Sequence, residues 1–315
     1  MLQTMNSELY AIIGPTAAGK TKAAFELARR IGGEVVSVDS RQIYRYMDIG
    51  TDKISHADRK IVPHHLIDIA DPDEEFSAAD FVRRAEDAVR RIAARGGIPI
   101  LAGGSPLYYK ALEGNMLSDG LPKDPNVRES LEREASERGN AAMHALLGEI
   151  DPDAALRIHP NDRYRILRAL EIWKLTGKGP TELYRERKKI GGIKIFYFGV
   201  KAPRDVLYKK IETRAAKQFE NGYPEEVEWL LSRGYSAEHP SMRGFGYREL
   251  IMYLKGGMTL EDALAGDIKS TRVFSRRQMT WFCKFRPILW YDFSEHDFDK
   301  VVGDMAVRIL DGRPL

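Results

Sequence analysis

The chain has 315 residues, of which 43% are hydrophobic and 30% charged, with a net charge of +3 and one cysteine, Cys283. This length predicts two domains, or one core with an insertion, and a single cysteine excludes an internal disulfide and a cysteine-based zinc site. No run approaches the ~20 apolar residues of a membrane span, and the N-terminal segment MLQTMNSELY lacks the features of a signal peptide, so we expect a soluble cytoplasmic protein.

The first predicted elements are a short buried strand over residues 9–13 and an amphipathic helix that begins near Lys20. Between them lies GPTAAGKT, which matches the Gly-x-x-x-x-Gly-Lys-Thr pattern of a phosphate-binding loop. The two glycines permit a tight turn that directs N–H groups at one anion, and the helix adds about half a positive charge. In such a loop Lys20 contacts the distal phosphate and the Thr21 hydroxyl ligates Mg²⁺. The predicted phosphate-binding residues are Gly14, Pro15, Thr16, Ala17, Ala18, Gly19, Lys20 and Thr21.

Apolar segments then alternate with helical ones. GEVVSVDSRQIY, HHLIDI and IPILAGGSPLYYKAL indicate strands with their following loops, and residues 78–94 indicate a helix. This alternation predicts an α/β fold with a P-loop parallel sheet flanked by helices and ligands at the carboxyl ends of the strands. Asp39 and Ser105 follow two of the strands and are expected at that edge, whereas Asp68 is expected to have a structural role in a turn.

Beyond Gly114 the sequence becomes charged and helix-forming, and no strand is predicted before IKIFYFGV at 193–200. We therefore expect the first part of the P-loop core over 1–114, an all-helical insertion over 115–192, and the second part of the core over 193–315. The core resumes with that strand and a long helix from about Arg204 to Arg233, with Gly222 as a candidate break.

Residues 269–286 have a distinctive composition. They include six basic residues and four aromatic ones, without any Asp or Glu. Such a segment suits both stacking on bases and contact with phosphates, and Arg276 and Arg277 are candidates for the second task. The alternative is a solvated basic helix whose aromatic residues face the core.

Seven segments occur in a defined order. GPTAAGKT is followed by VDSRQIYRYMDIGTDK, VPHHLIDI, GGSPLYYKAL, HPNDRYRILRALE, RGFGYRE and RRQMTWF. This ordered set resembles the tRNA dimethylallyltransferases of bacterial type, over residues 12–290. The resemblance implies transfer of the five-carbon group of dimethylallyl diphosphate to the exocyclic amine of the adenosine 3′-adjacent to a tRNA anticodon. The loop would then hold a diphosphate on an allylic carbon, and ATP is not the expected ligand.

The resemblance also implies roles for individual residues. Lys20 and Arg214 would bind the diphosphate, Ser105 would lie near the leaving oxygen, and Asp39 would take the proton of the amine. The alternatives are a surface ion pair for Arg214 and an indirect Mg²⁺ ligand for Asp39. The residues expected to contact tRNA are Asp39, Ser40, Arg41, Gln42, Ser105, Tyr164, Arg165, Ile166, Leu167, Arg168, Arg243, Gly244, Phe245, Gly246, Tyr247, Arg248, Arg276 and Arg277.

Three other functions use parts of this pattern. A small-molecule or nucleotide kinase shares the loop and the sheet, and an isopentenyltransferase acting on free adenine nucleotides shares the chemistry. An RNA-binding protein with an inactive site would not need Lys20, Thr21, Asp39 and Arg214 together. For the leading hypothesis we expect Mg²⁺, dimethylallyl diphosphate and the tRNA anticodon stem-loop as ligands, and a monomer without membrane association.

Overall fold

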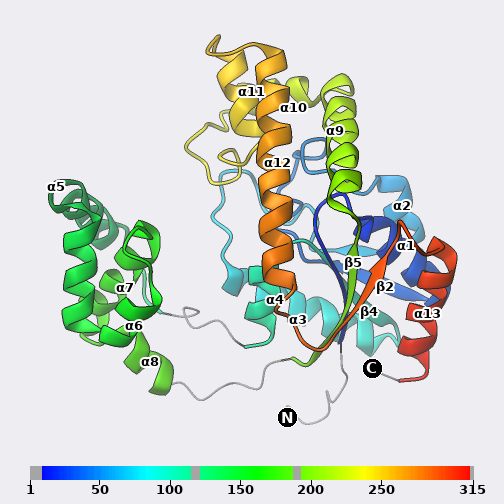
Figure 1. The fold of residues 1–315 in the computed structure, drawn as a ribbon, viewed down its shortest axis with the longest axis horizontal. Helices are drawn as coiled ribbons and strands as arrows, with labels where there is room; N and C mark the ends of the chain where they lie inside the picture. Colours follow the sequence, from blue (N-terminus) through cyan, green and yellow to red (C-terminus); the bar gives the residue numbers. More distant parts are fainter. Residues whose placement is uncertain (1–8, 115–120, 187–192, 313–315) are drawn as a thin grey trace. The chain divides into compact units, whose positions relative to one another are not determined.

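The computed structural model describes residues 9–114, 121–186 and 193–312. The chain divides into two compact units, a core unit of Met1–Glu113 and Ile193–Leu315 and a helical unit of Gly114–Gly192 (Figure 1). This division falls beside the boundaries expected for a helical insertion over 115–192. None of the helices in the described ranges has the length and apolar character needed to cross a membrane.

A parallel sheet of six strands forms the centre of the core unit, in the order β3-β2-β4-β1-β5-β6. Every pairing in it is parallel, and β1 is central, between β4 and β5. The predicted α/β fold with a helix-flanked sheet is confirmed. The strands are β1 (Leu9–Ile13), β2 (Gly33–Ser37), β3 (His64–His65), β4 (Ile98–Gly103), β5 (Ile195–Lys201) and β6 (Ile288–Asp292).

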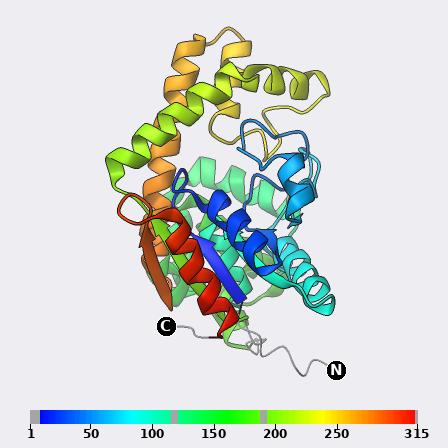
Figure 2. The same ribbon diagram turned by 90° about the vertical axis from the view of Figure 1, so that its right-hand side faces the viewer.

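Helices cover both faces of the sheet. One face packs against α3, α4 and the end of α12, and the other against α1 and α13 (Figure 2). Because both faces are buried, the central strands are apolar throughout rather than alternating. The helices of the core unit are α1 (Lys20–Ile31), α2 (His56–Ile61), α3 (Ala78–Ala94), α4 (Pro106–Leu112), α9 (Arg204–Glu220), α10 (Tyr223–Ser232), α11 (Tyr247–Leu254), α12 (Leu260–Phe282) and α13 (Phe298–Leu310).

A third apolar cluster of the core unit lies outside the sheet. The segment that follows β2 builds it together with α10, α11 and the first half of α12. Helices α9 and α12 pack against each other beside it (Figure 1). Gly222, with a left-handed φ of 98°, separates α9 from α10, so the expected long helix is broken at the candidate residue.

Two strand predictions need correction. HHLIDI supplies only the two residues of β3, because Leu66 and Asp68 have φ values of 62° and 57° and the chain turns out of the sheet. Asp68 pairs there with Lys53 and Arg59, which is the structural role expected for it. No strand was predicted over Ile288–Asp292, which forms the edge strand β6 beside β5.

The helical unit has its own apolar core. Three of its described helices pack around Leu131, Met143, Leu147, Ile166 and Leu167, and a fourth contacts two of these helices. The longest of them is kinked at Gly139, whose φ of 80° and ψ of 160° are not helical. The helices are α5 (Pro125–Ile150), α6 (Pro152–Arg157), α7 (Arg163–Thr176) and α8 (Pro180–Glu186).

Candidate active site

The loop between β1 and α1 borders a cavity of about 380 Å³ at the carboxyl ends of the central strands. The charged and hydroxyl side chains that line the cavity come mainly from α1, from the segment after β2 and from α9. A Cβ at Gly14 (φ 152°) would overlap the carbonyl oxygen of Val200, so the loop requires glycine where it passes β5. The lining side chains include those of Lys20, Thr21, Asp39, Asp52, Lys210 and Arg214.

The first turn of α1 presents unused hydrogen-bond donors. In the chain that the structure describes, no backbone hydrogen bond engages the N–H groups of Gly19, Lys20 and Thr21. An N-terminus with free amides attracts an anion. Two other amides of the loop already have partners: the Thr16 amide donates to Gln278 Oε1 (2.8 Å) and the Ala18 amide to the Pro15 carbonyl (3.3 Å). Phosphate binding by all eight loop residues stays a prediction.

Lys20 is half-buried at the head of this helix. Its Nζ donates to the Pro15 carbonyl at 2.8 Å. Burial lowers the pKa of Lys20 to about 8, while Asp39 acts in the opposite direction and Arg214 adds to the decrease. The ammonium shares the cavity with this carboxylate and this guanidinium.

Asp39 and Ser105 meet at the edge of the sheet, as expected from the strands they follow. Asp39 Oδ1 accepts hydrogen bonds from the Arg41 N–H (2.8 Å) and the Gln42 N–H (3.3 Å). Ser105 Oγ accepts a hydrogen bond from the Ser40 N–H at 3.0 Å, so the turn after β4 is tied to the turn after β2. The turn that carries the Asp39 carboxylate is thereby tied to the Ser105 hydroxyl.

Arg214 reaches the cavity from α9. Its Nη1 lies 3.1 Å from Asp52 Oδ2, and Asp52 has a left-handed φ of 53°. Arg214 therefore forms an ion pair, as one alternative expected, and also lines the cavity, as the other expected. Arg214 and Lys210 also line an adjoining cavity of about 770 Å³, where α9 adds Lys209 and Lys217. Positive charge thus continues outward from the loop along α9.

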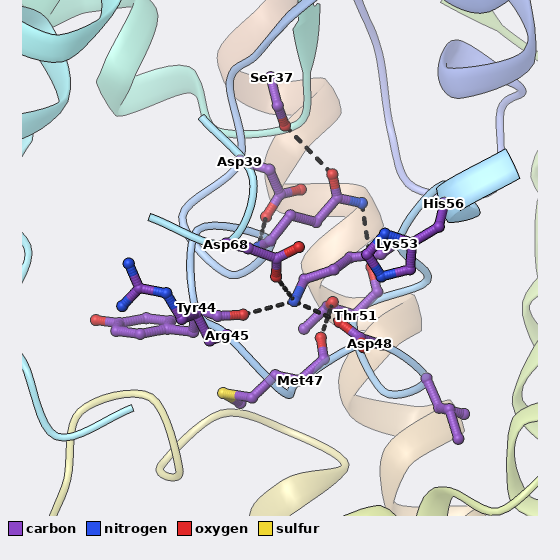
Figure 3. A network of polar contacts seen from close by, with 12 residues as sticks. Ser37, Asp39, Tyr44, Arg45, Met47, Asp48, Thr51, Lys53, His56 and Asp68 are labelled. Atoms are coloured by element: carbon purple, nitrogen blue, oxygen red, sulfur yellow. Dashed lines mark hydrogen bonds and ion pairs between the residues drawn. The ribbon is translucent and has the colours of Figure 1, made fainter. Parts of the chain in front are cut away.

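Two charged residues hold the segment that carries Asp39, and neither was predicted as a site residue. The ammonium of Lys53, whose side chain is 1% exposed, contacts the Tyr44 carbonyl oxygen (2.5 Å), Asp48 (2.7 Å) and Asp68 (2.6 Å; Figure 3). The carboxylate of Glu226 accepts hydrogen bonds from three consecutive N–H groups, those of residues 48, 49 and 50. Lys53 does lie in one of the seven ordered segments, but its burial and partners depend on packing.

The predicted tRNA-contacting segments of the core unit touch each other. The Arg41 guanidinium lies over the rings of Phe245 (5.0 Å) and Tyr247 (5.4 Å), and a Cβ at Gly244 would overlap it. Tyr247 is fully buried and its hydroxyl donates a hydrogen bond to Glu226, so its side chain is not exposed for the predicted contact with tRNA. Gln42 spans the segment internally, from the Ser37 hydroxyl to the Thr51 carbonyl. The exposed members of RGFGYR are Arg243 and Arg248.

In the helical unit the predicted segment YRILR begins α7. Tyr164 is 70% exposed, but Ile166 and Leu167 are fully buried, so their side chains are not exposed for the predicted contact with tRNA. Burial follows from the helical period, because five consecutive helical residues point in different directions and only some of them face the core. Arg168 donates to the Pro122 carbonyl (2.9 Å) and pairs with Glu171 (3.0 Å), which leaves Tyr164 and Arg165 as the accessible members.

Residues 269–286 bury two of their aromatic side chains and expose two adjacent arginines. Phe282 and Phe285 are fully buried in the cluster against the sheet. Arg276 and Arg277 are exposed, and neither forms an ion pair with any residue that the structure describes. Trp281 is 42% exposed. The basic residues therefore remain available to a polyanion while part of the aromatic set supports the fold.

Fold and site together define the class of protein: an α/β protein whose P-loop, an arginine and an aspartate share one cavity. Residues 42–285 match the family described as IPP transferase. The tRNA dimethylallyltransferase of Thermomicrobium roseum is 43% identical over 300 residues, covering 95% of this chain and 91% of the relative. That of Alkaliphilus oremlandii is 41% identical and covers 98% of each chain. This chain belongs to the IPP transferase family, that of the tRNA dimethylallyltransferases.

Solved structures agree with this membership. The tRNA isopentenylpyrophosphate transferase from Bacillus halodurans has a TM-score of 0.70 and 40% identity, with 96% of each chain covered. A eukaryotic dimethylallyltransferase described as acting on tRNA has a TM-score of 0.83 and 26% identity, with 98% of this chain and 81% of that chain covered. The likeness therefore spans both the core unit and the helical unit.

Proposed function

We propose that this protein transfers the dimethylallyl group of dimethylallyl diphosphate to the exocyclic amine of the adenosine 3′-adjacent to the anticodon in tRNA, releasing diphosphate. One observation carries the proposal: the cations and free amides of the phosphate loop share a single cavity with Asp39. The cations and amides stabilise a leaving anion, and the carboxylate accepts the proton that the nucleophile must lose. The names of the relatives support the same substrates.

The diphosphate side of the cavity favours bond breaking. As the bond between the allylic carbon and the bridging oxygen breaks, negative charge collects on the diphosphate. Lys20, Arg214 and the N–H groups of α1 bind that charge more strongly as it develops, which lowers the barrier to transfer. The bidentate guanidinium of Arg214 suits phosphate oxygens particularly well.

The carboxylate side removes the proton. A bond forms between the amine nitrogen and the allylic carbon while the carbon–oxygen bond breaks, and the nitrogen then gives one proton to Asp39. Asp39 Oδ1 is held by two backbone N–H groups, and in the described chain no hydrogen bond engages its Oδ2. The Ser105 hydroxyl accepts from the Ser40 N–H and donates to the Ser40 hydroxyl at 3.4 Å, a long hydrogen bond that an oxygen of the substrate would replace.

The residues present fit a magnesium ion held jointly with the substrate. Thr21 is exposed at the head of α1 and its side chain lines the cavity with Asp39. The described residues contain no cluster of three His, Cys, Asp or Glu side chains that would hold a metal alone. Mg²⁺ commonly binds through one or two protein oxygens and substrate phosphates, and here it would neutralise the leaving diphosphate.

The tRNA would be bound by exposed basic and aromatic residues of both units. Arg243, Arg248, Arg276 and Arg277 are exposed on the core unit, and Tyr164 on the helical unit. Aromatic stacking on an unstacked base contributes about 1 to 3 kcal/mol, and arginines contact the backbone. Recognition of the anticodon stem-loop, a monomeric state and a cytoplasmic location belong to the same proposal.

Label transfer tests the function directly. Unmodified tRNA and free AMP are incubated in parallel with radiolabelled dimethylallyl diphosphate and Mg²⁺, without ATP. We expect label in tRNA alone. Label in AMP alone would establish a nucleotide prenyltransferase instead, and ATP turnover without any label transfer would establish a kinase.

A further inference from the structure

Gln278 lies near the end of α12, is 3% exposed, and places its side-chain amide between two loops of the active site. Its Oε1 accepts a hydrogen bond from the Thr16 N–H at 2.8 Å. Its Nε2 donates a hydrogen bond to the Gly104 carbonyl at 2.7 Å. One side chain thus joins the phosphate loop to the turn that carries Ser105.

The fit around this amide is tight. A Cβ at Gly104 would overlap Gln278 Nε2 and would lie 3.7 Å from Lys20 Nζ. The amide therefore lies close to the lysine of the phosphate loop. Both hydrogen bonds depend on the amide, one on its acceptor and one on its donor; glutamate would lack the donor and methionine would lack both.

We infer that Gln278 is a positioning residue for the diphosphate, which rests on the proposed function. By occupying the Thr16 amide, it restricts the ligand to the donors that follow in the loop. By binding the Gly104 carbonyl, it sets the separation between the phosphate loop and Ser105. The diphosphate is thereby held at a defined distance from the hydroxyl and from Asp39, without contacting Gln278 itself.

The test compares Gln278→Met with the wild-type full-length protein. Titration calorimetry with inorganic diphosphate and Mg²⁺ should show about ten-fold weaker binding by the variant. This is about the effect of losing one hydrogen bond. The rate of label transfer should fall while the KM for tRNA stays unchanged. Ser275→Ala is the matched control, because Ser275 is 2% exposed on the same helix and, in the described chain, shares no hydrogen bond with either loop.

A second variant, Gly104→Ala, disturbs the same amide without changing Gln278. Its methyl group should displace Gln278 and weaken diphosphate binding to a similar extent, and the double variant should be no weaker than either single variant. If thermal unfolding shows that Gln278→Met does not fold, Gly104→Ala alone still tests the inference. Wild-type diphosphate affinity in the folded Gln278→Met protein, or additive losses in the double variant, would overturn the inference. A wild-type protein that binds no diphosphate would instead overturn the proposed function, and the inference with it.

Discussion

Asp39 combines a fixed oxygen with a free one. The N–H groups of Arg41 and Gln42 hold Oδ1, so the orientation of the carboxylate is determined by its own turn. Replacement by alanine would remove both the proton acceptor and these two hydrogen bonds. Replacement by asparagine keeps an oxygen for the turn and removes only the basic group.

Asp39→Asn should therefore lower single-turnover transfer by about 10²- to 10⁴-fold, the usual contribution of a general base. Filter binding should show tRNA and diphosphate affinities close to those of the wild type. Asp39→Ala should be equally inactive and should also melt at a lower temperature. Transfer by Asp39→Asn at the wild-type rate would exclude Asp39 as the base.

Lys20 links the diphosphate to pH. Burial lowers its pKa to about 8, so in the free protein it loses its charge as pH rises through that value. A bound diphosphate favours the ammonium, and binding above pH 8 must then include uptake of a proton. Affinity should consequently fall as pH rises, approaching ten-fold per pH unit well above the pKa.

Calorimetry with inorganic diphosphate between pH 7 and pH 10, in buffers of different ionisation enthalpy, measures this uptake. Lys20→Met is the control, because deprotonation of the diphosphate itself remains in that variant and acts in the opposite direction. The difference between the two proteins isolates Lys20. Identical pH profiles would show that the lysine does not titrate with the ligand.

At the scale of elements, α12 serves two surfaces. Gln278 and Phe282 face the buried side, whereas Arg276 and Arg277 are exposed. Successive helical residues are about 100° apart, so neighbours in the RRQMTWF motif reach different environments. The same helix can thus support the phosphate loop and present cations to RNA.

Replacing Arg276 and Arg277 together with glutamine should weaken tRNA binding and reduce its salt dependence. The slope of log K against log salt should become shallower by about 0.7 for each single-strand phosphate that the protein no longer neutralises. Arg29→Gln and Arg30→Gln, on the exposed side of α1, form a control pair of equal charge change. An unchanged slope would assign Arg276 and Arg277 to a solvated surface.

At the scale of the whole molecule, the helical unit is a true insertion. The Ile193 N–H donates to the Leu112 carbonyl at 3.2 Å, so the chain leaves the core unit and returns to it at adjacent points. Each unit also has its own apolar core. Removal of the insertion should accordingly leave the core unit able to fold.

A variant with residues 114–192 replaced by a short glycine-serine linker should bind inorganic diphosphate like the wild type. Its affinity for tRNA should fall by at least about 10²-fold, because one of two linked binding surfaces is gone. Calorimetry and filter binding measure the two quantities on one preparation. Undiminished tRNA affinity would show that the helical unit does not bind RNA.

The sequence by itself determined the features whose signals are local. The phosphate loop lies between β1 and α1 as its glycines predict, and α3 spans the predicted residues 78–94. A serine at residue 77 with an aspartate at residue 80 forms the capping box that begins this helix. Periodicity and capping act over a few residues, and the ordered motifs were sufficient to indicate the family.

Only the tertiary structure decided which side chains of a motif face the site. Ile166, Leu167 and Tyr247 belong to predicted tRNA segments but are buried, because their orientation depends on what packs against them. Gln278 lies within the RRQMTWF motif, yet its hydrogen bond to Thr16 joins residues 262 positions apart. Hydrogen bonds between distant residues are products of packing, and a local pattern does not identify the partners.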